Sequence, residues 1–175
     1  LIQARLGLPI YLHEGDQAQQ GFLVEGWPCG LVIEVGPVPQ SLLHACIVEQ
    51  TRLALEACLE ALGKVSSGLL SFPDHLVVHL HLGSLDLPRD DFGRPAASVH
   101  PQLQGRDWQP LTAGAPLFLQ PDGEVIRFKG RDFPVPVFIN EAAYFEKHIA
   151  MSLTSRELWP LLEEWQEALQ QIAGS

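Results

Sequence analysis

Residues 29–63 constrain the fold more than any other part of the sequence. The run CGLVIEV (residues 29–35) is rich in β-branched residues and contains a single carboxylate, Glu34. Near-continuous apolar runs of this kind are typical of strands buried in a parallel sheet. Gly36-Pro37 ends the run, and Ser41 then fits the N-cap of a helix that extends to Gly63. A strand, a turn and a helix in this order predict an α/β unit.

The pattern changes after a Ser/Gly-rich connection at residues 66–71, which predicts a domain boundary. Residues 76–87 alternate loosely between apolar and polar side chains, as strands do. The tripeptide Pro121-Asp122-Gly123 lies between two short apolar segments and predicts a β-hairpin. Residues 134–139 form a further apolar run, and 140–147 suit a turn or a brief helix. This second part of the chain is therefore expected to be rich in β-structure.

Helical periodicity is expected at two places. In the first helix, one side carries Leu43, Ile47, Leu55, Cys58 and Leu62. At the C-terminus, Thr154 and Glu157 match a capping box, which predicts a helix from residue 154 to 173. Its apolar stripe comprises Leu158, Leu161, Leu162, Trp165, Leu169 and Ile172. The predicted domains are therefore residues 1–68, residues 69–153 and a C-terminal helix at 154–175.

Charge and length exclude several classes of function. The 175 residues carry a formal net charge of -10, which argues against a nucleic-acid surface because phosphates require positive side chains. No apolar run approaches the roughly 18 residues that would span a bilayer. The three cysteines form no CxxC pair and are expected to be small buried residues of a cytoplasmic protein. Because the chain begins with Leu1 and its only methionine is Met151, we expect a piece of a longer protein.

Glu34 is the strongest candidate for chemistry. A carboxylate within an apolar strand must be paired or desolvated, and strand ends in α/β sheets face the ligand crevice. A general base is one interpretation of Glu34, and an outward-facing or structurally paired carboxylate is the other.

His79 and His81 share one strand face and, together with His100, are candidate ligands of a zinc site. Ordinary surface or core histidines are the favoured interpretation, because the spacing alone is unspecific.

Four longer motifs, taken together, resemble one family. They are IEVGPVPQ (33–40), LPRDDFG (87–93), VHPQLQGRDWQPL (99–111) and PVFINEAAYFEK (136–147). Their order and separation resemble the C-terminal half of aspartoacylase and, less fully, the related succinylglutamate desuccinylases. The resemblance extends from about residue 9 to residue 151. It implies an α/β fold, with the latter part of a zinc-carboxypeptidase-like catalytic domain followed by a smaller β-rich C-terminal domain.

The resemblance also implies an activity and a set of site residues. Family members are zinc-dependent amidohydrolases that split an N-acyl amino acid into a carboxylate and a free amino acid. Glu34 matches the general base, Tyr144 matches a tyrosine that helps to bind substrate, and Glu141 matches a position that supports the site through hydrogen bonds. The zinc ligands belong to segments that precede the matched region, so this chain is expected to supply none of them and to be inactive alone.

One departure from the family bears on the substrate. The family has an arginine shortly before the general base, and this arginine binds the substrate carboxylate. No arginine occurs between Arg5 and Arg52, and Gln19-Gln20-Gly21-Phe22 occupies the corresponding place. Loss of this bidentate contact would weaken carboxylate binding unless a cation from the preceding part of the protein replaces it. The resemblance therefore implies an N-acetylaspartate-like N-acyl amino acid, with N-acetylaspartate itself left open.

The expected partner is thus a small-molecule N-acyl amino acid, with no nucleic acid and no membrane. The alternative is a non-catalytic binding or assembly module. In that case the apolar face of the tail helix, with Trp165 at its centre, would dock another subunit or a second copy in a homo-oligomer.

Overall fold

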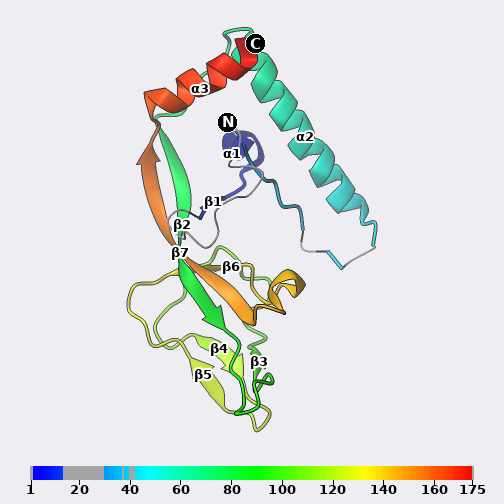
Figure 1. Ribbon diagram of the computed structural model, residues 1–175, viewed down its shortest axis with the longest axis vertical. Coiled ribbons are helices and arrows are strands. Elements are labelled where there is room, and N and C mark those ends of the chain that lie inside the picture. The colour runs from blue at the N-terminus through cyan, green and yellow to red at the C-terminus, as the bar shows by residue number, and fades with distance from the viewer. Residues whose placement is uncertain (1, 14–29, 37, 40–41, 175) are drawn as a thin grey trace. The chain divides into compact units, whose positions relative to one another are not determined.

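A computed structural model describes residues 2–13, 30–36, 38–39 and 42–174, which form two compact units (Figure 1). Unit 1 comprises Leu1–Ile10, Gly15–Leu76 and Leu158–Ser175, and unit 2 comprises Tyr11–Glu14 and Val77–Glu157. The helices are α1 (Ile2–Leu6), α2 (Ala45–Ser66) and α3 (Glu163–Gly174), with the 3-10 turn η3 (Ala142–Tyr144). The strands are β1 (Ile10–Leu12), β2 (His75–Asp86), β3 (Ser98–Val99), β4 (Pro116–Leu119), β5 (Val125–Arg127), β6 (Val135–Val137) and β7 (Ile149–Pro160).

Helix α2 is the longest helix of unit 1, and both α1 and α3 pack against it. The predicted helix is confirmed, although it begins at Ala45 rather than near Ser41, which lies outside the described residues. Its buried residues are Ala54, Ala57 and Val65. The predicted leucine face is wrong as the core side, since Leu55 and Leu62 are 61% and 42% exposed. Two alanines allow other helices to approach closely, whereas leucines at those positions would hold them apart.

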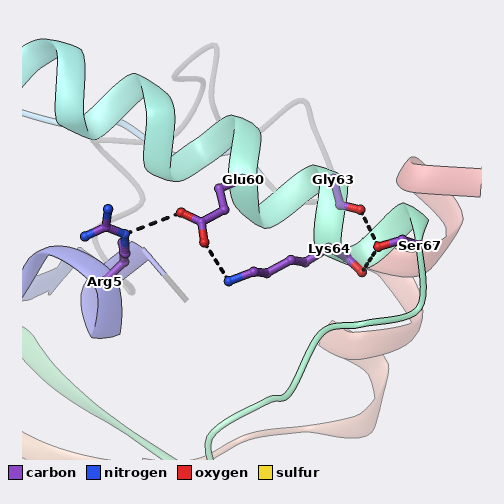
Figure 2. A network of polar contacts seen from close by, with 5 residues as sticks. All are labelled: Arg5, Glu60, Gly63, Lys64 and Ser67. Carbon is purple, nitrogen blue, oxygen red and sulfur yellow. Dashed lines mark hydrogen bonds and ion pairs between the residues drawn. The ribbon is translucent and has the colours of Figure 1, made fainter.

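Polar contacts link the short N-terminal helix α1 to α2 and complete the end of α2 (Figure 2). Glu60 accepts a hydrogen bond from Arg5 at 3.4 Å and one from Lys64 at 2.6 Å. Both pairs are exposed, so each is expected to contribute less than about 1 kcal/mol. The Ser67 hydroxyl donates to the Gly63 carbonyl at 2.8 Å, which satisfies one of the last carbonyls of the helix.

The predicted buried strand at 29–35 is wrong for the residues that the structure describes. Residues 30–36 form no regular element, and Val32 is 70% exposed. An apolar run becomes a buried strand only when neighbouring strands pair with it on both sides. No such neighbour occurs among the strands of the described part of the chain.

Two sheets dominate the remainder of the fold. Strands β1, β2, β7 and β6 form a four-stranded sheet in that order, and β3, β4 and β5 form a three-stranded sheet. The hairpin predicted around Pro121-Asp122-Gly123 is confirmed: β4 and β5 pair antiparallel, and Gln120 N–H donates to Glu124 at 2.9 Å. The hydrophobic core of unit 2 lies between these elements and comprises Val99, Leu103, Leu111, Leu117, Phe118, Ala150 and Met151.

The C-terminal helix begins later than predicted. Residues 154–160 belong to strand β7, and α3 starts at Glu163. Thr154 pairs with Val135 of β6, and its hydroxyl donates to the Val135 carbonyl at 2.9 Å instead of capping a helix. Glu157 accepts a hydrogen bond from Ser155. Sheet pairing and a β-branched residue thus override the local capping pattern.

Two further expectations concern cysteines and membranes. Cys46 is exposed and Cys58 is half-buried, so the prediction of buried cysteines is wrong for Cys46, while Cys29 lies outside the described residues. Cys46 lies on the first turn of α2, on a part of the helix where every residue except Ile47 is exposed.

Within the described ranges, none of the helices is both long and apolar enough to cross a bilayer.

Candidate active site

Glu34, the proposed general base, lies in the irregular segment 30–36 of unit 1. Its side chain is exposed, and it forms no hydrogen bond or ion pair with any residue that the structure describes. Its neighbours Ile33 and Val35 are half-buried, so exposed and half-buried side chains alternate along this segment. Among the described residues Glu34 is therefore an exposed carboxylate without a partner, which suits a group that accepts a proton.

Tyr144 and Glu141 occupy one short turn of unit 2. Glu141 is the N-cap residue of η3, and its carbonyl accepts a hydrogen bond from Tyr144 N–H at 3.1 Å. Both side chains are half-buried. The turn is fixed at its base, because Asn140 N–H donates to the Ala150 carbonyl of β7 at 2.8 Å. The structure thus brings these two candidate residues together on a well-supported loop.

Tyr144 also belongs to a cluster of aromatic rings and histidines. This aromatic–histidine cluster comprises Tyr11, His13, His79, His81, Trp108, Phe138 and Tyr144. Phe138 lies at its centre, with ring centroids 5.0 Å from Tyr11, 6.4 Å from Trp108 and 5.9 Å from Tyr144. Such edge-on and tilted contacts restrict ring rotation. The orientation of Tyr144 is consequently coupled to that of Phe138.

The loops that form the cluster carry unusual backbone conformations. Trp108 and Phe138 adopt positive φ angles of 66° and 56°, and Asn140 follows with 57°. Bulky side chains rarely adopt this region because Cβ approaches the backbone too closely. Residues held in such conformations cluster at functional sites, where the surrounding structure offsets the strain. Here Trp108 N–H donates to the Pro136 carbonyl at 3.0 Å, which ties the two strained segments together.

The histidines proposed as zinc ligands contact other side chains and the backbone instead. Tyr11 Oη lies 2.9 Å from His81 Nδ1, and the His81 ring stacks on His13 with centroids 4.3 Å apart. His79 Nδ1 lies 3.3 Å from Thr154 Oγ1. His100 Nδ1 accepts a hydrogen bond from Gln102 N–H. The part of the chain that the structure describes contains no group of three His, Cys, Asp or Glu side chains able to hold a metal ion.

A small hollow, open to solvent, lies beside η3 in unit 2. We call it the Arg89 hollow. Its walls are Leu87, Arg89, Pro95, Asn140, Glu141, Phe145, His148, Ile149 and Ala150. Apart from Pro95 and His148, these residues come from two of the motifs that carry the family resemblance, LPRDDFG and PVFINEAAYFEK, and from the start of β7. The hollow therefore borders the same turn that presents Tyr144.

Sequence reasoning missed most of these neighbours. Arg89 stands in a motif that the sequence identifies, but nothing in its spacing distinguishes it from Arg94. Tyr11 and His13 repeat the two-residue spacing of His79 and His81, which is a signal for one strand face. The segment Gln19-Gln20-Gly21-Phe22, which we expect at the place of the family's carboxylate-binding arginine, lies outside the described residues.

Several known proteins are similar to this chain. Residues 74–156 match the family described as the AstE/AspA barrel-sandwich hybrid domain. A "Probable aspartoacylase" of Prochlorococcus marinus (strain MIT 9313) is 76% identical over 172 residues, covering 98% of this chain and 57% of the relative. A "Probable aspartoacylase" of Parasynechococcus marenigrum (strain WH8102) is 58% identical, covering 99% of this chain and 57% of the relative. The chain thus spans little more than half the length of these curated relatives.

A solved structure is similar as well. The crystal structure of murine aminoacylase 3 matches with a TM-score of 0.63 and 37% identity, covering 73% of this chain and 43% of that protein. The predicted fold class, the latter part of a carboxypeptidase-like α/β domain followed by a smaller β-rich domain, is confirmed.

Proposed function

Since this chain belongs to the aspartoacylase/AstE family, we propose that it forms part of a hydrolase that cleaves the amide bond of N-acyl amino acids. The observation that carries the proposal is the pairing of Tyr144 and Glu141 on one fixed turn, within the residues that match the AstE/AspA barrel-sandwich hybrid domain. The substrate is a small molecule, and the products are a carboxylate and a free amino acid.

Glu34 acts as the general base in this proposal. Its carboxylate accepts a proton from the water that adds to the scissile carbonyl carbon, and it then donates this proton to the leaving nitrogen as the C–N bond breaks. A positioned carboxylate typically accelerates such proton transfers about 10²–10⁴-fold. Its exposed side chain, which has no partner among the described residues, supports this role.

Tyr144 binds the substrate and Glu141 supports the turn that presents it. The Tyr144 hydroxyl can donate a hydrogen bond to a substrate carbonyl or carboxylate. The ring of Tyr144 contacts the ring of Phe138, with centroids 5.9 Å apart, and this contact favours one placement of the tyrosine ring. Preorganised donors of this kind lower the cost of binding because little rotamer freedom is lost.

The cofactor expected from the family is zinc, and the zinc dependence of the whole protein is part of the proposal. The residues described here do not fit a zinc site, because they include no group of three potential ligands. We further propose a cytoplasmic location, which the free thiols of Cys46 and Cys58 support since exposed thiols persist in reducing compartments.

The alternative, a subunit-assembly surface, has one observation in its favour. Helix α2 exposes Val48, Leu55 and Leu59 by 53%, 61% and 60%. By contrast, Trp165 of α3 stacks on Trp159, with ring centroids 6.5 Å apart, and is only 38% exposed. The apolar face of α3 is therefore already partly covered within this chain. Sedimentation or light scattering of Leu55→Glu against the parent protein would reveal self-association through α2.

Release of free amine from N-acetylated amino acids tests the proposed function. The full-length protein is assayed with N-acetyl-L-aspartate and N-acetyl-L-leucine, and with their C-terminal amides as comparison substrates. We expect hydrolysis of at least one N-acetyl amino acid. A folded, metal-loaded protein that releases amine from none of them would contradict the proposal.

A further inference from the structure

The backbone of unit 2 bends where it leaves strand β6. Val137 is the last residue of β6, and Phe138 and Asn140 then adopt positive φ angles of 56° and 57°. Ile139 lies between them, is half-buried and packs against the core of unit 2. Positive φ is unfavourable for residues other than glycine, so contacts from the surrounding structure must hold these backbone angles. We call residues 138–140 the β6 bend.

A carboxylate from a distant segment holds the middle of the β6 bend. Asp107 Oδ1 accepts a hydrogen bond from Ile139 N–H at 3.1 Å, and the Asp107 side chain is half-buried. This N–H belongs to the peptide group that follows Phe138, so the bond fixes the orientation of that peptide group. Hydrogen bonds to an ionised acceptor are stronger than those between neutral groups. The end of the bend is held separately, since Asn140 N–H donates to the Ala150 carbonyl at 2.8 Å.

The segment that carries Asp107 is itself bound to β6. Trp108 N–H donates to the Pro136 carbonyl at 3.0 Å, and Leu111 N–H donates to the Pro134 carbonyl at 2.8 Å. Pro136 is the central residue of β6, and Pro134 immediately precedes the strand. The Asp107 carboxylate is therefore presented to the β6 bend by a segment that is bound to the strand from which the bend starts.

The backbone angles of the β6 bend determine where the Phe138 ring lies. Its centroid lies 5.9 Å from that of Tyr144 and 6.4 Å from that of Trp108, the residue next to Asp107. A change of the backbone at Phe138 would move this ring and alter its contact with the tyrosine. We infer that Asp107 is a positioning residue of the candidate site. Its hydrogen bond to Ile139 N–H keeps the Phe138 ring in the place where it orients Tyr144.

The effect of Asp107 on hydrolysis rests on the proposed function, in which Tyr144 binds the substrate, whereas its effect on the Tyr144 ring can be measured without any substrate. A positioning role predicts that loss of Asp107 weakens substrate binding only while the Tyr144 hydroxyl is present. A residue needed for folding alone predicts a loss of the same size whether or not that hydroxyl is present, because the two changes are then independent.

Fluorine NMR of the full-length protein, labelled with fluorotyrosine, reports on the tyrosine ring directly. The Tyr144 resonance is identified by its absence in Tyr144→Phe. We expect Asp107→Ala to shift or broaden this resonance, whereas Asp107→Asn keeps an oxygen that accepts the hydrogen bond and should leave it near its parental position. Asp122→Ala is the matched control, because Asp122 Oδ1 accepts a hydrogen bond from Glu124 N–H at 3.0 Å in the β4–β5 turn. This control should leave the Tyr144 resonance unchanged.

Steady-state kinetics with an N-acetyl amino acid provide the second readout. Asp107→Ala should raise KM about three- to fivefold with kcat nearly unchanged, and Asp107→Asn should raise it less than about twofold. In the Tyr144→Phe background, Asp107→Ala should change KM by less than about twofold, because the hydroxyl that it positions is already absent. Asp107→Glu displaces the carboxylate by one methylene group and replaces Asp107→Ala in both experiments if that variant does not fold.

Either of two results overturns the inference. One is an unchanged Tyr144 resonance in the folded Asp107 variant that lacks the hydrogen bond. The other is a rise in KM of equal size with and without the Tyr144 hydroxyl. The two proposals fail separately: hydrolysis with an unmoved Tyr144 resonance refutes only the role of Asp107. A protein that hydrolyses no N-acetyl amino acid refutes the proposed function, and the Tyr144 resonance then decides the inference by itself.

Discussion

His79 Nδ1 and Thr154 Oγ1 lie 3.3 Å apart in the interior of unit 2, and both residues are almost fully buried. The Thr154 hydroxyl donates its only proton to the Val135 carbonyl at 2.9 Å. It can therefore only accept from His79, which must carry its proton on Nδ1. One pair thus links strands β2, β7 and β6 and sets the tautomer of a buried histidine.

Stability should depend on pH through this histidine. Burial, together with the charge of Arg156, lowers the pKa of His79 below its ordinary value of 6.5. The folded state therefore binds the proton less tightly than the unfolded state, and the neutral form favours folding. This stabilisation is complete above pH 6.5 and is lost as the pH falls from there through the folded-state pKa.

Urea unfolding between pH 8 and pH 5 measures that dependence. The parent protein should lose stability on acidification, and His79→Phe should lose less of it over the same range. Exposed His75→Gln is the control and should follow the parent curve. An unchanged slope in His79→Phe would show that other groups govern acid sensitivity.

Removing the Thr154 hydroxyl should destabilise unit 2 directly. Thr154→Val keeps the shape of the side chain but leaves the His79 donor and the Val135 carbonyl without their partner. A buried polar group left unpaired costs about 1–3 kcal/mol, and the loss should appear in the free energy of unfolding. Thr154→Ser retains the hydroxyl and should lose clearly less. Equal losses in the two variants would assign the effect to packing.

Substitution of Met151, in the core of unit 2, should lower the stability of the protein. This residue is fully buried among Val99, Leu117 and their neighbours. Met151→Ala is expected to lower the free energy of unfolding by about 2–5 kcal/mol, because it removes apolar contacts and leaves a cavity. Phe92→Ala, at a position that is 83% exposed, should change stability by less than about 0.5 kcal/mol. Thermal unfolding of both variants provides the comparison.

Tyr144→Phe should affect substrate binding more than turnover. If its hydroxyl binds the substrate equally in the ground and transition states, KM rises about five- to tenfold with kcat nearly unchanged. The chain has two tyrosines, so Tyr11→Phe is a natural control that removes the hydrogen bond to His81. Steady-state kinetics with an N-acetyl amino acid distinguish the two. A rise in KM for Tyr11→Phe and none for Tyr144→Phe would contradict the assignment.

Local patterns in the sequence predicted the elements whose stability is local. The hairpin at Pro121-Asp122-Gly123 formed where turn chemistry required it, and the long helix formed from its periodicity. Thr154 and Glu157 illustrate the opposite case. Their capping pattern favours a helix, yet pairing of Thr154 with Val135 across the sheet prevails. Pairing between strands that are distant in the sequence cannot be predicted from a short segment alone.

The site was predictable only in part for a similar reason. Motif order drew attention to Glu34, Glu141 and Tyr144. Arg89 drew attention only once the fold placed it in the lining of the same hollow as Glu141. The positive φ angles of Trp108 and Phe138 were also invisible beforehand, because both are residues that rarely adopt such conformations.

The rate of amide hydrolysis by Glu34→Gln tests the central claim most directly. The full-length protein and this variant are compared with an N-acetyl amino acid at saturating concentration, alongside Glu167→Gln, which alters an exposed carboxylate of α3. Bound zinc and folding are measured on the same samples. We expect kcat to fall about 10²-fold or more in Glu34→Gln, with zinc content unchanged and Glu167→Gln fully active. A Glu34→Gln protein that retains the parental rate would contradict the account.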